Sequence, residues 1–243
     1  MTVIGVIPAR FAATRLPGKL MRLVAGKPLI QWVIEAAKTS DLLDQVIVAT
    51  DHQEIYELSL SLGVQAVMTP SNLPSGSDRV WAAVKNKKAD VVLNIQGDEP
   101  LITGHLIDQL IKPMLNEKHL EMGTLARKIK PEEIEKQSVV KIVCNKNNEA
   151  LYFSRFPIPY SRETIKEVES ANLKHIGMYA YRSSFLQTFC ETEPSKLELA
   201  EGLEQLRALY LGAKIKVVEV VHESWGVDVE EDINQVEKIL KNK

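Results

Sequence analysis

The sequence is poor in cysteine, has no long apolar run and carries no excess of positive charge. Its 243 residues include only Cys144 and Cys190, without a C-x-x-C spacing, which argues against a disulfide framework and a cysteine zinc site. No apolar stretch is long enough to span a bilayer. The formal net charge of -2 argues against a general nucleic-acid or membrane-surface binder. We expect a reduced, cytoplasmic setting, because the chain enters a strand directly without a basic leader.

The glycine-rich loop of P-loop enzymes is also missing, yet the N-terminal segment VIGVIPARFAATRLPGK holds Arg10, Arg15 and Lys19. Its β-branched start predicts a buried strand that breaks at Pro8 into a basic loop, and residues 29–37 are spaced as a helix. A strand, a basic loop and a helix in this order favour polyphosphate binding, because backbone N–H groups, cations and a helix N-terminus all attract anionic oxygens. A solvated basic loop is the alternative.

Strands alternate with helical patterns through the first half of the chain. The predicted elements are strands at 45–50, 65–68 and 91–95, and helices at 55–62, from about Val80, and at 105–115. Such units predict a mostly parallel sheet with helices on both faces, whose ligands lie beyond the carboxyl ends of the strands. The basic loop, Asp51, the SGSDR loop and Asp98 follow those ends, so we expect them to share one crevice.

From about Gly123 the pattern changes to antiparallel pairing, which predicts an insertion and not a second independent domain. Strands are expected at 124–129, 139–143, 150–153, 175–181 and 215–221, a hairpin turn at 145–148, and helices at 184–189, 197–211 and 231–240. We predict a single domain over 1–243, with a nucleotide-binding half at about 1–122, an antiparallel portion at about 123–211 and a C-terminal portion at about 212–243.

Asp98 follows a predicted buried strand in the turn GDEP. A carboxylate there, opposite phosphate-seeking cations, is a natural ligand for Mg²⁺, which binds few carboxylates together with substrate phosphates. The alternative is that Asp98 caps the following turn. A second metal carboxylate must come from elsewhere, and Asp228 near the end of the chain is the best positional candidate.

Seven motifs occur in an order that resembles the 3-deoxy-manno-octulosonate cytidylyltransferases. They are IPARFAATRLPGKL, LPSGSDR, NIQGDEPL, ALYFSRFPIPY, KHIGMYAYR, LELAEGLEQLR and GVDVEED. The resemblance spans almost the whole chain. It implies a Rossmann-like nucleotidyltransferase three-layer α/β sandwich with an antiparallel insertion used for dimerisation, and an enzyme that joins CTP and the acid sugar Kdo into CMP-Kdo and pyrophosphate for lipopolysaccharide core synthesis. It also implies a homodimer that uses Mg²⁺.

The same resemblance assigns residues to roles. The implied nucleotide contacts are Pro8, Ala9, Arg10, Arg15, Lys19, Ser75, Gly76 and Arg79. The implied metal ligands are Asp98 and Asp228, which together with Lys19 and Arg15 form the catalytic set. The implied Kdo contacts are Gln96, Arg155, His175, Tyr179, Glu204 and Gln205.

Five of these residues have a structural alternative. Arg79 would otherwise be a surface arginine, His175 and Tyr179 would be core residues, and Glu204 and Gln205 would lie on a solvated helix face. The chemistry fits the sugar nevertheless, because an arginine fork suits a carboxylate while Gln, Tyr and Glu suit hydroxyls. In a strand, His175 and Tyr179 share a face and are expected to point into one pocket.

We expect the anomeric 2-hydroxyl of Kdo, or its alkoxide, to attack the α-phosphorus of CTP and expel pyrophosphate, with catalysis resting on positioning and charge neutralisation. Segment 161–173 is charged and is expected to be an exposed loop or a flap over the sugar site. Two rival functions stay open. One is the same chemistry on 8-amino-Kdo or a sialic acid, and the other is a catalytically silent nucleotide-binding protein.

Overall fold

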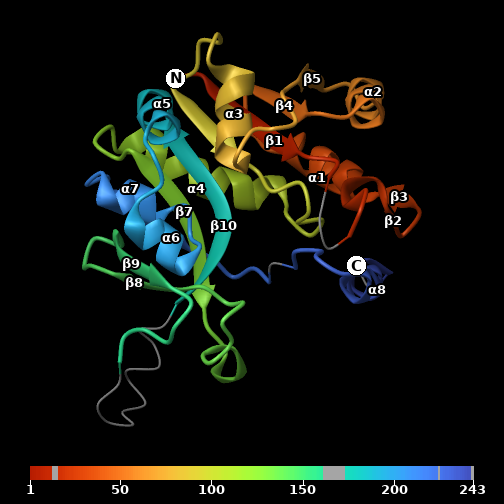
Figure 1. Cartoon of the computed structure of the whole chain (residues 1–243). Helices are drawn as coiled ribbons and strands as arrows, with labels where there is room; N and C mark the ends of the chain where they lie inside the picture. The colour runs from red at the N-terminus through yellow and green to blue at the C-terminus, as the bar shows by residue number, and fades with distance from the viewer. Residues whose placement is uncertain (13–15, 161–172, 224, 242–243) are drawn as a thin grey trace. The chain divides into compact units, whose positions relative to one another are not determined.

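The computed structural model describes residues 1–12, 16–160, 173–223 and 225–241 (Figure 1). It forms two compact units: unit 1 is Met1–Gln109 with Glu223–Lys243, and unit 2 is Leu110–His222. Unit 1 is therefore discontinuous in sequence. Within the described ranges no helix is long and apolar enough to cross a membrane. Both cysteines are free.

Unit 1 contains four neighbouring parallel strands. Its elements are β1 (Val3–Ala9), η1 (Lys19–Met21), β2 (Leu23–Val24), β3 (Lys27–Pro28), α1 (Leu29–Ala37), β4 (Gln45–Thr50), α2 (Gln53–Ser61), β5 (Gln65–Met68), α3 (Gly76–Val84), β6 (Val91–Asn94), the start of α4 (Gly104–Asn116), and α8 (Glu230–Lys241). The strand order is β6-β1-β4-β5, and every pairing is parallel. The predicted parallel α/β architecture and the bounds of α1, β4 and β5 are confirmed.

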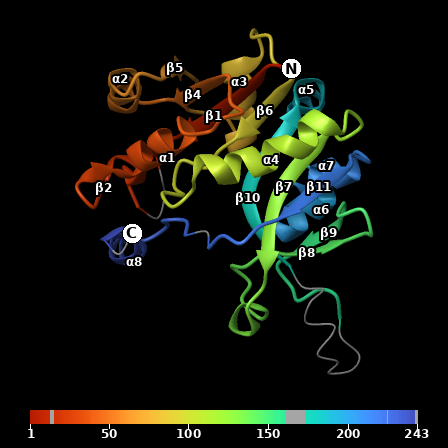
Figure 2. The same ribbon diagram turned by 180° about the vertical axis from the view of Figure 1, so that it is seen from behind.

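The path of the chain reverses beside β1. From β1 it runs to β4 and β5 on one side, and it then returns to β6 on the other. Right-handed crossovers place α1 and α2 on one face of such a sheet and α3 on the opposite face, and Figures 1 and 2 show α3 and α1 on opposite sides of β1. Ligands of open parallel sheets bind where the strand order reverses. The carboxyl ends of β1 and β6 therefore mark the binding site of unit 1.

Strand β1 does not break at Pro8 as predicted, and continues to Ala9. The carbonyl of Val6 accepts the N–H of Ile95, so Val6 and, two residues on, Pro8 direct their backbone groups toward β6. Pairing with β6 ends at Asn94. The missing N–H of Pro8 would thus point beyond the end of β6, where no ladder hydrogen bond is lost.

Helix α3 begins at Gly76, earlier than the predicted start near Val80. Ser75 is its N-cap and accepts the N–H of Asp78 at 3.1 Å. This cap satisfies an N–H group that the first turn leaves without a helical partner. The predicted loop residues Gly76 and Arg79 therefore belong to the first turn of a helix.

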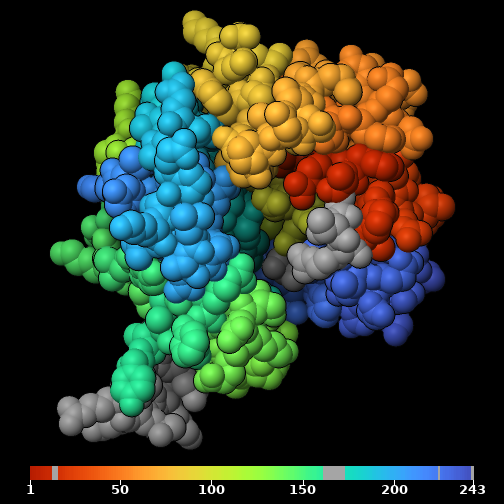
Figure 3. Space-filling model, viewed as in Figure 1, coloured from red at the N-terminus to blue at the C-terminus, as the bar shows by residue number. Residues whose placement is uncertain are grey.

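The C-terminal helix α8 packs on the β2–β3 hairpin of unit 1. Glu237 Oε1 accepts the N–H of Ala25 at 2.8 Å, and Arg22 forms a 3.6 Å ion pair with Glu230. Figure 3 shows the blue C-terminal residues against the red N-terminal ones. Residues that follow the whole of unit 2 in sequence are thereby fixed next to the basic loop.

Unit 2 combines antiparallel and parallel strands. Its elements are the end of α4, β7 (Met122–Lys128), η2 (Pro131–Glu133), β8 (Lys141–Cys144), β9 (Ala150–Ser154), β10 (Leu173–Arg182), α5 (Ser183–Glu191), α6 (Lys196–Glu201), α7 (Leu206–Tyr210) and β11 (Ile215–Glu219). Strand β10 pairs antiparallel with β7 and β8, β8 forms a hairpin with β9, and β11 pairs parallel with β7. The predicted antiparallel portion is confirmed. Its predicted limits at about 122 and 211 stay a prediction.

The predicted helix over 197–211 is wrong, because α6 and α7 are separate. Ser195 accepts the N–H of Glu198 while the Glu198 carboxylate accepts the N–H of Ser195, a capping box that starts α6. Gly202, at φ 61°, ends it in the left-handed region that glycine adopts without steric cost. A single helix over 197–211 would place its leucines on one buried face. Leu199 is 69% exposed whereas Leu206 is fully buried, so these two leucines do not share such a face.

Candidate active site

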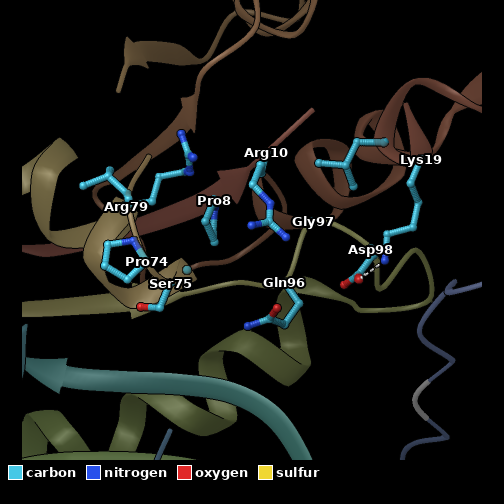
Figure 4. Close-up of a pocket in the computed structure, with 12 residues that line it drawn as sticks. Pro8, Arg10, Lys19, Pro74, Ser75, Arg79, Gln96, Gly97 and Asp98 are labelled. Atoms are coloured by element: carbon cyan, nitrogen blue, oxygen red, sulfur yellow. Dashed lines mark hydrogen bonds and ion pairs between the residues drawn. The ribbon is translucent and has the colours of Figure 1, made fainter. Parts of the chain in front are cut away.

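A pocket lies at the carboxyl ends of β1 and β6, where the strand order reverses (Figure 4). Its volume is about 300 Å³. The residues that line it are Pro8, Arg10, Lys19, Leu20, Leu73, Pro74, Ser75, Gly76, Arg79, Gln96, Gly97 and Asp98. Arg10 and Lys19 of the basic loop, the SGSDR loop and Asp98 share this pocket as predicted, whereas Asp51 is not among the residues that line it.

Lys19 joins two carboxylates at one end of this pocket. Its Nζ lies 2.5 Å from Asp98 Oδ2 and 3.2 Å from Asp228 Oδ1. Asp98 follows β6 and Asp228 precedes α8, and the N–H of Val227 donates to the carbonyl of Asp98 at 3.0 Å. The side chain of Lys19 is 13% exposed and that of Asp228 is 47% exposed, so the cluster opens to solvent on the Asp228 side. The two carboxylates picked from the sequence are brought together.

This cluster fits a divalent cation. The ammonium of Lys19 is a positive group held by both carboxylates, which shows that their oxygens converge on one cationic centre. Carboxylate oxygens are hard ligands, and Mg²⁺ commonly takes one or two of them together with water and phosphate oxygens. Among the described residues no group of three or more His, Cys, Asp or Glu side chains could hold a metal. A divalent cation held by these two carboxylates would take its remaining ligands from water or phosphate oxygens.

The N-terminus of α3 forms the opposite wall. Ser75 and Gly76 line the pocket at the first turn, and a Cβ on Gly76 would meet Pro8 at 3.7 Å. Unpaired N–H groups and the helix dipole favour anionic or carbonyl oxygens at such a terminus. Arg10 extends from the end of β1 toward Gly97 in Figure 4. The pocket is thus lined by cationic and N–H-rich groups on two sides.

Arg79 lines the pocket, but its guanidinium is turned toward the end of β4. It is 2% exposed, so the alternative of a surface arginine is wrong. Its Nη2 donates to Asp51 Oδ2 at 3.0 Å and its Nη1 donates to Thr69 Oγ1 at 2.6 Å. Sequence reasoning placed Asp51 at the crevice but missed its pairing with Arg79. The signal available was an acidic residue directly after a strand end.

The remaining residues expected in unit 1 have different positions. Pro8 and Gln96 line the pocket, and Gln96 Nε2 donates to Asn94 Oδ1 at 3.4 Å. Ala9 is fully buried in β1, which leaves its backbone as the part that could contact a nucleotide. Arg15 lies outside the described residues, as does most of segment 161–173.

Four of the predicted sugar contacts gather in unit 2. The His175 and Tyr179 rings lie 5.5 Å apart, and Tyr179 Oη donates to Gln205 Oε1 at 3.2 Å. Burial and the charge of Glu204 raise the pKa of Tyr179, so the phenol stays protonated. Strand β10 bulges between Ile176 and Tyr179. Because the bulge inserts two residues, the alternation of faces is kept and the two rings point together as predicted.

His175 is a buried neutral imidazole. Burial lowers its pKa to about 3. Thr124 Oγ1 lies 2.9 Å from both His175 Nε2 and the carbonyl of Met178. The hydroxyl has one hydrogen and the carbonyl can only accept, so Thr124 donates to Met178 and the His175 Nε2–H donates to Thr124. This leaves Nδ1 as an acceptor.

Arg155 is held by backbone carbonyls. Its Nε, Nη1 and Nη2 donate to the carbonyls of Glu201, Gln137 and Gly202 at 2.8, 3.1 and 3.3 Å. The Glu201 carboxylate also accepts the N–H of Arg155 and the hydroxyl of Ser154. The guanidinium thus fastens the end of α6. Sequence reasoning missed Glu201, which no motif distinguished from the other acids of its helix.

Comparison with known proteins gives consistent matches. A family profile described as Cytidylyltransferase matches residues 4–215. The 3-deoxy-manno-octulosonate cytidylyltransferase of Bdellovibrio bacteriovorus is 54% identical, with 100% of this chain and 99% of the relative covered. That of Thermodesulfovibrio yellowstonii is 45% identical, with 99% and 98% covered. A solved structure of CMP:2-keto-3-deoxy-manno-octonic acid synthetase complexed with CTP is 37% identical, covers 100% of this chain and 99% of that one, and has a TM-score of 0.94.

Proposed function

Because the chain belongs to the 3-deoxy-manno-octulosonate cytidylyltransferase family, we propose that it activates Kdo with CTP to give CMP-Kdo and pyrophosphate. The observation that carries this proposal is the convergence of Asp98 and Asp228 on Lys19, beside a pocket lined by a second cation and a helix N-terminus. Two carboxylates and cations at one point are what nucleotidyl transfer needs.

In the proposed reaction, the anomeric 2-hydroxyl oxygen of Kdo attacks the α-phosphorus of CTP. A bond forms between that oxygen and phosphorus, the bond from the α-phosphorus to the oxygen shared with the β-phosphate breaks, and pyrophosphate leaves while the hydroxyl proton passes to solvent. Arg10 and Lys19 would neutralise the triphosphate, and Ser75 and Gly76 would contact the base and ribose end. The protein thus contributes positioning and fixed charge, with no dedicated base among these residues.

We propose that Asp98 and Asp228 hold Mg²⁺, because their oxygens converge on one cationic centre. When bound, the ion would supply charge neutralisation at the phosphates and greater acidity of the attacking hydroxyl. Lys19 would then shift its contacts from the carboxylates to the phosphates.

We further propose that unit 1 carries the CTP site. The family resemblance assigns Kdo contacts to Gln96 in unit 1 and, separately, to His175, Tyr179, Glu204 and Gln205 in unit 2. Arg155 is retained as a candidate for the Kdo carboxylate; it would have to leave its present carbonyl partners to serve there. By the family resemblance we also propose a cytoplasmic homodimer acting in lipopolysaccharide core synthesis.

The test is pyrophosphate release by purified protein with CTP and Mg²⁺, comparing Kdo, 8-amino-Kdo and N-acetylneuraminate, with no-sugar and EDTA controls. Release that needs both Kdo and the metal is expected. Preference for another acid sugar would show that the protein carries out the same reaction on a different substrate. Folded protein that binds CTP but releases no pyrophosphate with any sugar would contradict the proposed activity.

A further inference from the structure

Asp51 directly follows β4 and contacts two segments that each contribute residues to the pocket, the segment after β1 and helix α3. Its Oδ2 accepts from Arg79 Nη2 at 3.0 Å, and its Oδ1 accepts the N–H of Phe11 at 3.0 Å. Phe11 belongs to the segment that follows β1, and Arg79 belongs to α3. One carboxylate at the end of β4 therefore connects the start of the basic loop to the helix that forms the opposite wall.

The Asp51–Arg79 ion pair is buried. The side chains are 7% and 2% exposed, and Arg79 Nη1 also donates to Thr69 Oγ1. A buried ion pair that loses one charge leaves the other uncompensated, so its partner is expected to move or to attract water. The position of Arg79 at the pocket therefore depends on the charge of Asp51 and not only on packing.

The next residue, His52, supports the basic loop from a second direction. Its ring stacks on Phe11 with centroids 3.6 Å apart and planes 6° from parallel. The Phe11 ring in turn lies against Gly18, whose φ of 63° sets the turn into Lys19, and a Cβ on Gly18 would meet the ring at 3.6 Å. Phe11 thus links Asp51 and His52 to the vicinity of Gly18, the residue before Lys19.

We propose that Asp51 is a positioning residue for the nucleotide, which sets the spacing between the wall carrying Arg10 and Lys19 and the wall carrying Ser75, Gly76 and Arg79. This inference rests on the proposed function, because it specifies how the CTP site of that function is kept in shape. Asp51 contacts neither reacting atom. It acts through Phe11 and Arg79.

The test compares Asp51→Asn with Glu198→Gln. Asparagine keeps an acceptor for the Phe11 N–H but removes the charge that holds Arg79. Glu198→Gln is the matched control, since Glu198 forms a buried ion pair with Arg207 at 2.6 Å in unit 2. We expect Asp51→Asn to raise the KM for CTP and the Kd of CTP without sugar at least tenfold, while the KM for Kdo changes less than twofold. Glu198→Gln should leave the Kd of CTP within twofold of wild type.

Asp51→Glu, which keeps the charge, is expected to recover part of the CTP affinity, and it supplies the test if Asp51→Asn does not fold. In a double-mutant cycle with Arg79→Gln, the two changes should be less than additive in the Kd of CTP, because Asp51 acts through Arg79. An unchanged Kd in folded Asp51→Asn, or an equal loss in Glu198→Gln, would overturn the proposal. The Kd of CTP is measured without sugar, so it reports on Asp51 even if no Kdo activity is found.

Discussion

The ammonium of Lys19 is shared by Asp98 and Asp228, which lie 79 and 209 residues further along the chain. The side chain of Lys19 is largely buried, and its ammonium forms ion pairs with both carboxylates. Lys19 would therefore compete with a divalent cation proposed to bind the same oxygens.

Replacing Lys19 by methionine separates its competition with the metal ion from its proposed contact with the CTP phosphates. A charge pair at about 4 Å is worth on the order of 4 kcal/mol at an effective dielectric constant of about 20, reduced here by solvent on the Asp228 side. We expect Mn²⁺ binding without CTP, followed by electron paramagnetic resonance, to tighten about tenfold, while turnover falls by about two orders of magnitude. Lys27→Met, which removes a surface lysine paired with Glu35, should change neither. Unaltered Mn²⁺ affinity in Lys19→Met would disprove the competition.

Asp98→Asn is expected to lower the rate of pyrophosphate release by roughly a hundredfold or more, without unfolding the protein. The amide keeps the size of the side chain but loses the charge that Lys19 and a metal ion require. Asp44→Asn is the control, because Asp44 accepts the N–H of Val3 at the other end of β1. Substantial turnover of Asp98→Asn at saturating Mg²⁺ would rule out the assigned role.

Asp232 fixes the segment that carries Asp228. Its Oδ2 accepts the N–H groups of Asp228 and Val229 at 2.8 and 3.0 Å, at the start of α8. Asp232→Ala should lower the free energy of unfolding by about 1 kcal/mol, as loss of a helix cap does, and raise the Mg²⁺ concentration that gives half-maximal rate. Asp232→Asn retains a hydrogen-bond acceptor, so its effects on the free energy of unfolding and on the metal dependence should be smaller. The idea fails if the metal dependence of Asp232→Ala matches wild type.

The buried imidazole of His175 makes stability depend on pH. Its pKa is about 3 when folded against 6.5 ordinarily, so the unfolded state takes up the proton first as the pH falls. Stability is then fully present above pH 6.5 and decreases toward pH 3, with a slope of at most about 1.4 kcal/mol per pH unit. Denaturant titrations at a series of pH values give the free energy of unfolding as a function of pH. Between pH 6.5 and pH 3 this free energy should fall less steeply in His175→Gln than in His119→Gln, which alters an exposed histidine. Equal slopes would contradict this account.

Local patterns predicted most of the parallel half correctly, because its apolar runs and turn residues agree with the final packing. The bounds of β4 and β5 needed no tertiary information. One error came from reading Pro8 as the end of β1, which continues to Ala9. Two others arose where one residue changed the backbone against the periodicity. Gly202 interrupts a leucine pattern that reads as one helix, and Ser75 starts α3 before its apolar residues begin.

The site was only partly accessible from the sequence. Asp98 follows a strand and was placed by chemistry, whereas Asp228 became convincing only through the family resemblance. The hydrogen bonds that hold Arg79 and Arg155 depend on partners such as Asp51 and Glu201, which no spacing rule connects to them. Contacts between distant segments form on folding and leave no periodic signal.

The last segment of unit 1 follows residue 222 in sequence, so the ribosome synthesises it after unit 2. A ribosome must translate all of unit 2 before Asp228 and α8 are available to join β1 and the basic loop. Any chain released before residue 228 lacks one of the two carboxylates around Lys19, whatever the state of its sheet. Premature termination therefore yields chains that lack part of this cluster, and the nucleotidyl transfer proposed for it would require that all of unit 2 be translated first.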